Sequence, residues 1–425
     1  MSPVTTTRWD NQTMALGLYI SVPFCRTKCT YCNFASDVFS RAVFNRYLDR
    51  VCSDLERAQT IAEKTGARFE SAVDSLYLGG GTPTLLDSQQ LSRLFVTVKQ
   101  NFCLLPDAEI TVECAPGTLS EEAIELLARL GVNRVSLGVQ SFVDKEAAAV
   151  ARLHKRETVL EEIARLRACG LSNINIDLIA GLPHQTEESW AYSLAETLGT
   201  GAPHVSVYML EVDEDSRLGR ELIAGGTKYH AHFVPDEDLT ADLYVAACDQ
   251  LNASGMSQYE ISNFARHGFE SKHNLKYWTR QPYFGFGVDA HSMLKAGDEK
   301  HVGSDRGNPD GRKGLTIDNL ESVRLAAPDF FEKYVGGAEY QSTFISPEAA
   351  LEEAFFLGLR LNCGLDLSNL EKEFGSERVS ASKPVIDELI ESGLLEQRGS
   401  KIWLTARGRL LSNEVSEKFL SATAV

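Results

Sequence analysis

The sequence predicts an α/β fold, a partial (β/α)6 barrel followed by a smaller, α-rich module. Short apolar runs alternate with helix-period segments between Leu16 and Leu210, a pattern typical of parallel strands joined by right-handed helical crossovers. From Ser346 the pattern becomes predominantly helical. At 425 residues and 43% hydrophobic content, the chain is long enough to bury one large core and one small one.

Six runs rich in Val, Ile, Leu and Tyr are expected to form the strands of the barrel, because buried parallel strands are apolar on both faces. In chain order they are LGLYISV from Leu16, SLYLGGG from Ser75, EITVEC from Glu109, RVSLGVQ from Arg134, NINIDLIAGLP from Asn173 and HVSVYML from His204. Helix-period segments separate them, and several begin with a Ser or Thr cap and end at Gly. We expect these helices within 41–64, 88–100, 120–131, 158–170 and 187–198.

The chain is expected to divide into three parts, the barrel over 1–255, a linker and barrel-covering segment over 256–345, and a winged-helix-like domain over 346–425. The middle part contains the Gly-rich run FGFGVDAHS and a loop of Gly, Asp, Lys and Asn over 296–314, which predicts a surface excursion. The last part has helical patterns within 347–361, 367–375 and 383–393, then a hairpin around Arg398. A final helix is expected over 406–420, with Thr405 as its N-cap.

Charge and composition exclude several classes of protein. Asp and Glu number 59 against 42 Lys and Arg, a formal net charge of −17 that would repel a nucleic-acid backbone. No run approaches the roughly 18 apolar residues of a membrane span, and no secretory signal precedes the first strand. We therefore expect a cytoplasmic protein with no transmembrane segment and no nucleic-acid partner. Its C-terminal module is expected to pack against the barrel or a protein partner.

Three of the nine cysteines lie together in CRTKCTYC, directly after the first predicted strand. A loop there can wrap Cys25, Cys29 and Cys32 around one inorganic centre, and thiolates are natural ligands of iron–sulfur clusters. The alternatives are a structural zinc completed by a His, or three incidental thiols. Zinc sites usually have two pairs of ligands, and no CxxC or HxxxH pair follows. A four-iron cluster held by three cysteines leaves one iron open to a chelating small molecule.

The Gly-rich run GGGTPT follows the second predicted strand. Without Cβ atoms, Gly79, Gly80 and Gly81 allow the backbone to approach a ligand closely, although such turns often only link a strand to a helix. Together, CxxxCxxC after the first strand and GGGTPT after the second resemble the radical-SAM superfamily. The resemblance implies a 4Fe-4S cluster on the three cysteines and S-adenosylmethionine (SAM) chelating the open iron, in a TIM-like partial barrel of the radical-SAM type.

Further runs resemble one branch of that superfamily, which contains the oxygen-independent coproporphyrinogen III oxidase HemN and the haem chaperone HemW. They are YISVPFC, LYLGGGTPTLL, ITVECAPGT, NRVSLGVQSF, LHKR, INIDLIAGLPHQT and KHNLKYW. By motif, the resemblance implies contacts with SAM from Tyr19, Tyr31, Gly80, Gly81, Thr82, Glu113, Gln140, Arg152 and Asp177. Most lie at or just beyond the ends of strands, where barrels collect their ligands. Taken singly, each is equally compatible with an ordinary polar residue of a barrel.

The hydrogen-bonding groups of these side chains are of the kinds that the amino, carboxylate and ribose groups of SAM require. Glu113 and Asp177 can accept hydrogen bonds from an amino group or ribose hydroxyls, and Arg152 can pair with a carboxylate. Gln140 can both donate and accept, and Tyr31, between two cluster cysteines, can shield or stack. The histidines His154, His184 and His291 are assigned to the SAM site or to packing.

Two features separate the branches of the family. The oxidase branch has a fourth cysteine two residues after the third, where this chain has Phe34, which argues against oxidase activity. The chaperone branch has an HNxxYW motif, which is present here as His273, Asn274, Tyr277 and Trp278.

The motif resemblance implies haem binding, with an exposed His273 as an axial ligand of the iron and aromatic side chains as a wall for the macrocycle. The alternative is that Tyr277 and Trp278 pack the linker against the barrel while His273 hydrogen-bonds locally.

Our first hypothesis is therefore a haem carrier on a radical-SAM barrel. It binds haem or a porphyrin as cargo and delivers it to a haem-accepting protein, such as a membrane-associated respiratory cytochrome. The second hypothesis is an oxygen-independent coproporphyrinogen dehydrogenase, which removes propionate carboxyls as carbon dioxide to leave vinyl groups. The third is a radical-SAM enzyme with an unrelated substrate. The sequence leaves open whether SAM is cleaved in function.

Overall fold

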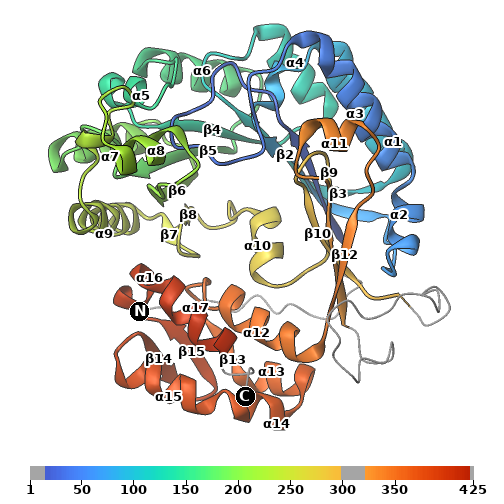
Figure 1. Cartoon of the computed structure of the whole chain (residues 1–425). Helices are drawn as coiled ribbons and strands as arrows, with labels where there is room; N and C mark the ends of the chain where they lie inside the picture. The colour runs from blue at the N-terminus through green and yellow to red at the C-terminus, as the bar shows by residue number, and fades with distance from the viewer. Residues whose placement is uncertain (1–14, 298–320, 422–425) are drawn as a thin grey trace.

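A computed structural model describes residues 15–297 and 321–421 and confirms the predicted α/β fold (Figure 1). All six predicted barrel strands are present and pair in parallel in the order β1-β2-β3-β4-β5-β6. Their buried apolar side chains alternate along each strand, as Leu16, Leu18, Ile20 and Val22 do in β1, and so lie on one face of the sheet. The other face is largely polar, with Ser75, Thr111 and Ser136 among its buried residues, so the expectation of strands that are apolar on both faces is wrong. The strands are β1 Leu16–Val22, β2 Ala72–Gly80, β3 Cys103–Cys114, β4 Arg134–Gln140, β5 Ile174–Ala180 and β6 His204–Met209.

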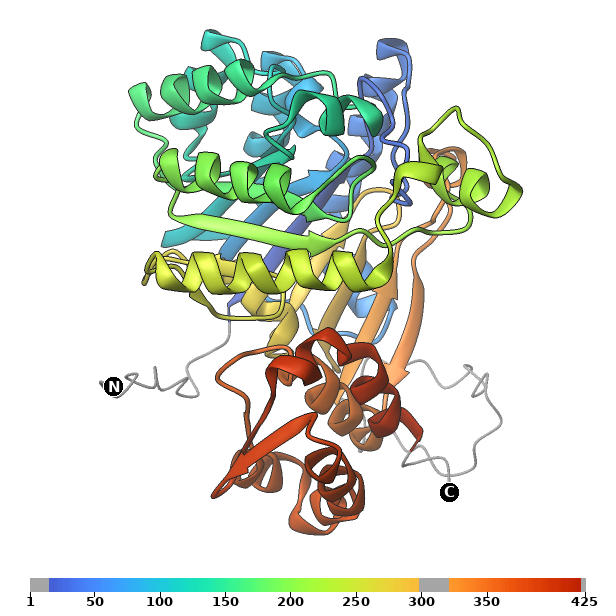
Figure 2. The ribbon, with the colours of Figure 1, turned by 90° about the vertical axis from the view of Figure 1, so that its left-hand side faces the viewer.

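The helices that connect these strands lie along the outer face of the sheet (Figure 2). The helix expected over 41–64 is interrupted at Arg57, where ψ is 11°. Among the described residues, no helix has both the length and the apolar character needed to cross a bilayer. The helices of this part are η1 Arg41–Val43, α1 Phe44–Glu56, α2 Ala58–Lys64, η2 Pro83–Leu85, α3 Ser88–Asn101, α4 Glu121–Leu130, α5 Asp144–Ala149, α6 Arg156–Ala168, α7 Glu187–Gly199, α8 Arg217–Ala224, η3 Ala231–Phe233 and α9 Glu237–Ala253.

The segment after residue 255 adds strands to both edges of the same sheet, which the sequence did not predict. On one edge, β8 pairs antiparallel with β6, and on the other, β9 pairs parallel with β1. Most of the loop expected over 296–314 lies outside the described residues. The elements are β7 Ser257–Gln258, β8 Asn263–Ala265, α10 Lys272–Trp278, β9 Tyr283–Phe286, β10 His291–Lys295, β11 Ser322–Ala326, α11 Phe331–Val335 and β12 Gln341–Ile345.

The C-terminal module contains the predicted helices and hairpin, and Thr405 caps a helix by accepting a hydrogen bond from the Gly408 amide. The helix expected over 406–420 is broken at Leu411, and the change of direction buries Val415 and Phe419 in the core of the module. The elements are α12 Pro347–Gly358, β13 Leu365–Asp366, α13 Leu367–Phe374, α14 Ser376–Ala381, α15 Lys383–Glu391, β14 Leu395–Arg398, β15 Lys401–Leu404, α16 Ala406–Leu410 and α17 Ser412–Ser421.

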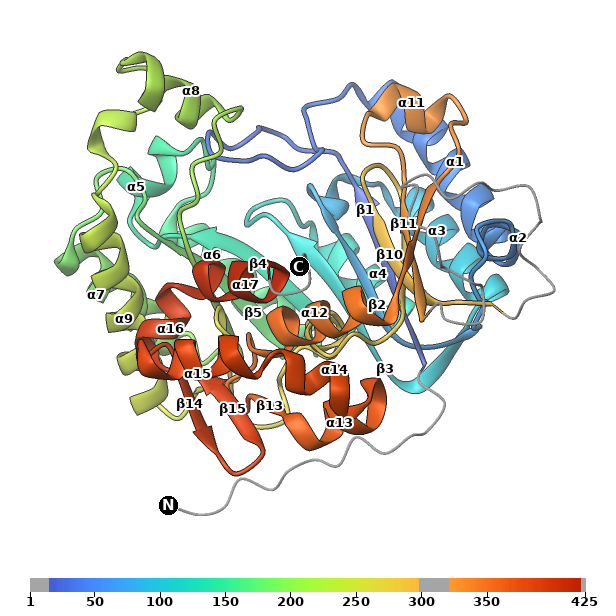
Figure 3. The ribbon, with the colours of Figure 1, turned by 60° about the horizontal axis from the view of Figure 1, so that its bottom comes forward.

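The module packs against the barrel, as expected, and lies across its open side next to α10 (Figures 1 and 3). Two backbone hydrogen bonds join the end of α12 to the segment before β8, Ile261 N to Arg360 O (3.1 Å) and Asn362 N to Tyr259 O (3.0 Å). Arg280, just after α10, contacts Glu353 of α12 at 3.3 Å. The end of α12 is therefore held in place at the mouth of the barrel.

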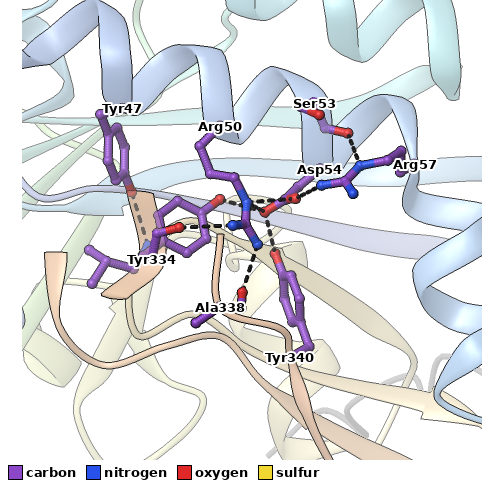
Figure 4. Close-up of polar contacts among 9 residues, drawn as sticks. Tyr47, Arg50, Ser53, Asp54, Arg57, Tyr334, Ala338 and Tyr340 are labelled. Carbon is purple, nitrogen blue, oxygen red and sulfur yellow. Dashed lines mark hydrogen bonds and ion pairs between the residues drawn. The ribbon is translucent and has the colours of Figure 1, made fainter. Parts of the chain in front are cut away.

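A buried carboxylate joins α1 to the segment that precedes β12 (Figure 4). Asp54 is fully buried and accepts hydrogen bonds from Arg50 Nε (2.9 Å), Arg57 Nη2 (2.9 Å) and Tyr334 OH (2.9 Å). Arg50 also donates to the backbone carbonyls of Tyr334 and Ala338, each at 2.9 Å. These bonds satisfy the carboxylate and connect parts of the chain that are far apart in sequence.

Replacement of Asp54 by alanine is expected to lower the free energy of unfolding by about 3–5 kcal/mol, because Arg50 would keep a charge that has lost its buried partner. Asp49 on the same helix pairs with Arg93, but its side chain is 63% exposed. The Asp49→Ala control is therefore expected to cost less than about 1 kcal/mol. Urea denaturation of both variants measures the difference, and equal costs would show that the Asp54 contacts do not stabilise the fold.

Candidate functional site

Every predicted site residue except Tyr19 and His273 lines one cavity of about 810 Å³. The cavity opens at the carboxyl ends of the barrel strands, where Gly80, Glu113 and Gln140 are located, and reaches Asp177 in the middle of β5. Its far wall comes from the C-terminal module. Its volume lies toward the upper end of the range of about 300–1,000 Å³ that is usual for ligand sites.

The three clustered cysteines lie in the loop after β1, and all three are free and partly buried at the cavity wall. The amide of Cys25 donates to the Asp37 carbonyl at 3.0 Å, and burial raises the pKa of the Cys25 and Cys32 thiols. Within the described residues, no three His, Cys, Asp or Glu side chains are arranged to hold a single metal ion. A four-iron cluster differs from such a site because each cysteine binds a separate iron. Three thiols on one loop facing a cavity suit that donor set.

The glycine loop after β2 is hydrogen-bonded to the backbone segment that immediately precedes Cys25. Gly81 N donates to Val22 O at 2.9 Å, and Thr82 N donates to Phe24 O at 2.7 Å. A Cβ atom at Gly81 would lie 2.8 Å from both of these carbonyl oxygens. Gly81 is therefore required for close packing of two loops, whereas the sequence suggested close approach to a ligand. Gly80 has a φ of 97°, which favours glycine.

Glu113 is bound between two neighbours at the end of β3. Its Oε1 accepts from Tyr77 OH at 2.8 Å, and its Oε2 accepts from the Gly80 amide at 3.1 Å. Burial raises the pKa of Glu113 to about 7, and the nearby charge of Asp177 adds to the effect. The carboxyl group can therefore change its charge near neutral pH. Tyr77 is not among the predicted site residues, although its alternation with Gly79 along β2 places both on one face of the strand.

Gln140 and Arg152 have polar atoms without partners at the cavity wall. Gln140 has a φ of 70°, uncommon for a residue other than glycine, and its buried Oε1 makes no hydrogen bond. Arg152 donates to the Gly138 carbonyl and to Cys29 Sγ at 3.5 Å, while its buried Nε has no partner. Buried polar atoms left unpaired beside a cavity are typical of a ligand site. A guanidinium next to Cys29 suits the carboxylate of a molecule that chelates a cluster there.

Asp177 begins a chain of buried hydrogen bonds inside the barrel. Asn175 Nδ2 donates to Asp177 Oδ1 at 2.7 Å, and Ser206 Oγ lies 3.2 Å from Asn175 Oδ1 and 2.8 Å from Asn263 Oδ1. Asn263 in turn donates to Glu260. Barrel interiors are usually filled with branched apolar side chains, so this polar chain departs from the usual pattern. It connects the predicted SAM site with the wall formed by the C-terminal module.

The HNxxYW motif forms α10, and its histidine does not face the cavity as expected. His273 is only 1% exposed, so the expectation of an exposed imidazole is wrong. Its Nδ1 lies 3.0 Å from Ser75 Oγ, and its Nε2 lies 2.9 Å from Tyr277 OH. Burial lowers the pKa of His273 to about 3, so the ring is neutral. Asn274, Tyr277 and Trp278 line the cavity instead, which agrees with the alternative that His273 hydrogen-bonds locally.

Tyr19 lines a smaller neighbouring cavity of about 300 Å³, which shares Gly80 and Tyr277 with the large one. Phe34, at the position of the fourth cysteine of the oxidase branch, is 65% exposed and lies at the rim of both cavities. Of the other histidines, His154 lines the large cavity and its Nε2 lies 3.0 Å from the Val139 carbonyl. His291 lines the smaller cavity, while His184 packs against His230 outside both.

Comparison with known proteins identifies the family. The model of the Radical SAM superfamily matches residues 19–195, and that of the HemN C-terminal domain matches residues 345–411. The heme chaperone HemW of Bacillus subtilis (strain 168) is 35% identical over 406 residues, 95% of this chain and 98% of that protein. The chain belongs to the HemW family. The similarity extends over both the barrel and the C-terminal module, so the family predicted from the sequence motifs is confirmed.

Two further relatives and one solved structure are similar to this chain over most of its length. The heme chaperone HemW of Escherichia coli (strain K12) is 28% identical over 409 residues, 96% of this chain and 98% of that protein. The mitochondrial radical S-adenosyl methionine domain-containing protein 1 of Bos taurus is 31% identical over 384 residues, 89% of this chain and 81% of that protein. The structure of coproporphyrinogen III oxidase (HemN) from Escherichia coli shares the fold, with 24% identity, a TM-score of 0.78, and coverage of 97% of this chain and 91% of that one.

The structure adds cavity residues that the sequence did not reveal. Tyr208 lies at the end of β6, Glu260 and Asn263 lie near β8, and Arg360 and Arg409 come from the C-terminal module. None of these lies within a recognisable motif. Their place at the cavity follows from tertiary packing, because α12 and α16 reach the barrel from more than a hundred residues further along the chain.

Proposed function

We propose that this protein binds a 4Fe-4S cluster, SAM and haem, and that it delivers haem to an acceptor haemoprotein. The observation that supports this most directly is the convergence of the cysteine loop, the proposed SAM contacts and the aromatic residues of the HNxxYW motif on one cavity. Relatives that align over nearly the whole chain are named heme chaperones. The acceptor is proposed to be a haemoprotein such as a membrane-associated cytochrome, and the carrier itself to be cytoplasmic.

In this proposal, Cys25, Cys29 and Cys32 would hold the cluster, and SAM would bind at the iron that has no cysteine. When bound, these groups would supply one-electron radical chemistry, which the cofactors carry themselves. The chain positions them: Arg152, 3.5 Å from Cys29 Sγ, pairs with the SAM carboxylate. Glu113 and Asp177 accept hydrogen bonds from its amino or ribose groups. The remaining proposed contacts are Tyr19, Tyr31, Gly80, Gly81, Thr82 and Gln140.

Haem is proposed to lie in the same cavity with its macrocycle against Tyr277 and Trp278. For His273 to bind haem iron, its Nε2 must first leave the Tyr277 hydroxyl, 2.9 Å away. In the arrangement described, His273 instead holds Tyr277 in position as part of the wall. These two roles of His273 make different predictions for the absorption spectrum of bound haem.

Haem titration into the anaerobically reconstituted protein tests the proposal, with His273→Ala and Tyr277→Phe as variants. The wild-type protein is expected to take up haem saturably. If His273 only positions Tyr277, both variants weaken uptake similarly and the absorption band of bound haem keeps its wavelength. If His273 binds the iron, only His273→Ala shifts the band. Absence of saturable uptake by the wild-type protein would contradict the proposed function.

The same samples, incubated with coproporphyrinogen III, SAM and a reductant, test the oxidase alternative. No decarboxylation is expected, because Phe34 replaces the fourth cysteine of the oxidase branch. Release of carbon dioxide with formation of vinyl groups would restore the oxidase assignment despite Phe34.

A further inference from the structure

The wall of the cavity that comes from the C-terminal module contains two arginines, Arg360 beyond the end of α12 and Arg409 in α16. We propose that these arginines bind the carboxylates of an acidic tetrapyrrole whose ring lies against Trp278 and Tyr277. The inference rests on the proposed function and adds to it a site for the propionate groups of the cargo. It also assigns a role to the C-terminal module, which completes the binding site.

Arg360 is positioned by the barrel but is not fully paired. Its Nη2 lies 3.5 Å from Glu260 Oε2, and its guanidinium carbon lies 4.3 Å from the centre of the Trp278 ring. Its buried Nε has no hydrogen-bond partner, and neither does the buried Nε1 of Trp278. Unpaired buried donors cost free energy unless a ligand or water accepts from them. Two such donors, side by side at a cavity, favour an anionic oxygen as the missing acceptor.

Arg409 is freer to take a carboxylate. Its Nη1 donates to the Leu404 carbonyl at 3.2 Å, and within the described part of the chain it forms no ion pair. It lies half-buried at the cavity wall beside Leu410. The planar fork of a guanidinium matches a carboxylate in two parallel hydrogen bonds. Arg409 therefore presents donors to the cavity that no acidic side chain of residues 15–297 or 321–421 occupies.

The distribution of charge around the cavity favours one orientation of an acidic ring, with its carboxylates toward the C-terminal module. Its barrel side carries the partly buried carboxyls of Glu113 and Asp177 and the buried carboxyl of Glu260. The cations on that side are Arg26 and Lys28, which belong to the cysteine loop, and Arg152, which contacts Cys29. The module side carries the two arginines. A ligand with an apolar macrocycle and two carboxylates at one edge would direct those carboxylates to the module. Helix α10, which lies between the barrel and the module (Figure 1), then supplies the flat wall.

The test compares haem with haem in which both propionates are methyl esters, titrated into the full-length reconstituted protein. Wild-type protein is expected to bind haem about ten- to a hundredfold more tightly than the diester, because charged hydrogen bonds contribute that much. Arg409→Gln is expected to lose most of this preference while binding the diester unchanged. Arg409→Lys keeps the positive charge but lacks the planar guanidinium, so its preference for haem over the diester should lie between those of the wild-type protein and Arg409→Gln.

Arg407→Gln is the matched control, since Arg407 is on the same helix but is exposed and donates to the Ser392 carbonyl at 3.1 Å. It should keep the wild-type preference, and thermal unfolding should show that the variants are folded. Equal affinity of the wild-type protein for haem and diester would overturn the carboxylate site and leave the haem proposal intact. An unchanged preference in Arg409→Gln would likewise overturn the site. Failure to bind either compound would contradict the proposed function itself, and this inference with it.

Discussion

Replacement of Cys29 by alanine is expected to abolish the visible absorption of the iron–sulfur cluster in anaerobically reconstituted protein. With three cysteines on one loop and no fourth at Phe34, each thiolate would hold a separate iron, so none is spare. Cys29 is also the cysteine that Arg152 approaches, at 3.5 Å. Its loss should therefore remove the cluster and the anchor for a SAM carboxylate together, and SAM binding should fall with iron content.

The matched control is Cys103→Ala, because Cys103 is exposed, free and at the start of β3, at the opposite end of that strand from Glu113. It should keep full iron content and absorption. Circular dichroism should show that both variants are folded, since Cys29 lies in a loop outside the strands. Iron content retained in full by folded Cys29→Ala would overturn the assignment of the cluster to this loop.

The six barrel strands could be predicted because each is a short run rich in Val, Ile, Leu and Tyr between two helix-period segments. The polar residues that alternate with them, such as Ser136 and Asn175, lie on the inner face of the barrel. The strands β7–β12 have no such signal. Several are only two to five residues long, and β9 contains a glycine. Only β8 and β9 pair with the edge strands β6 and β1, and the others extend the sheet from these two. Pairing between segments as far apart as β1 and β9 leaves no local pattern. The sequence therefore predicts a linker, whereas the segment widens the sheet to twelve strands.

The site could be predicted where motifs mark it, and not where helix packing decides it. In α10, the buried face includes Lys276, which is 2% exposed and pairs with Asp74 at 2.8 Å. A hydropathy pattern would place that lysine outside the fold and leave His273 free to face a ligand. The spacing of four between His273 and Tyr277 does place them on one helix face. Only the structure shows that His273 points toward β2, where its Nδ1 lies 3.0 Å from Ser75 Oγ.

The affinity for SAM is expected to rise with pH up to about pH 7, by about tenfold per unit well below that value, and then to level off. Burial raises the pKa of Glu113 from an ordinary 4.5 to about 7, so the carboxyl is largely neutral at pH 6. Only the ionised form offers both oxygens as acceptors to an amino or ribose group. Binding in the lower range must therefore release a proton, and the affinity falls as the proton concentration rises. Glu113→Gln should weaken binding at pH 7.5 and remove this dependence.

Glu162→Gln provides a matched control, because burial also raises the pKa of Glu162 to about 7. Its Oε2 accepts from the Gly117 amide at 2.8 Å and from Arg165 Nη2 at 3.1 Å, and it does not line the cavity. Calorimetric titration of SAM between pH 5.5 and 7.5, with cluster absorption recorded throughout, should show the wild-type slope in Glu162→Gln and a flat profile in Glu113→Gln. A slope that survives in Glu113→Gln would assign the titrating group elsewhere, with Asp177 next to be replaced, since burial raises its pKa too.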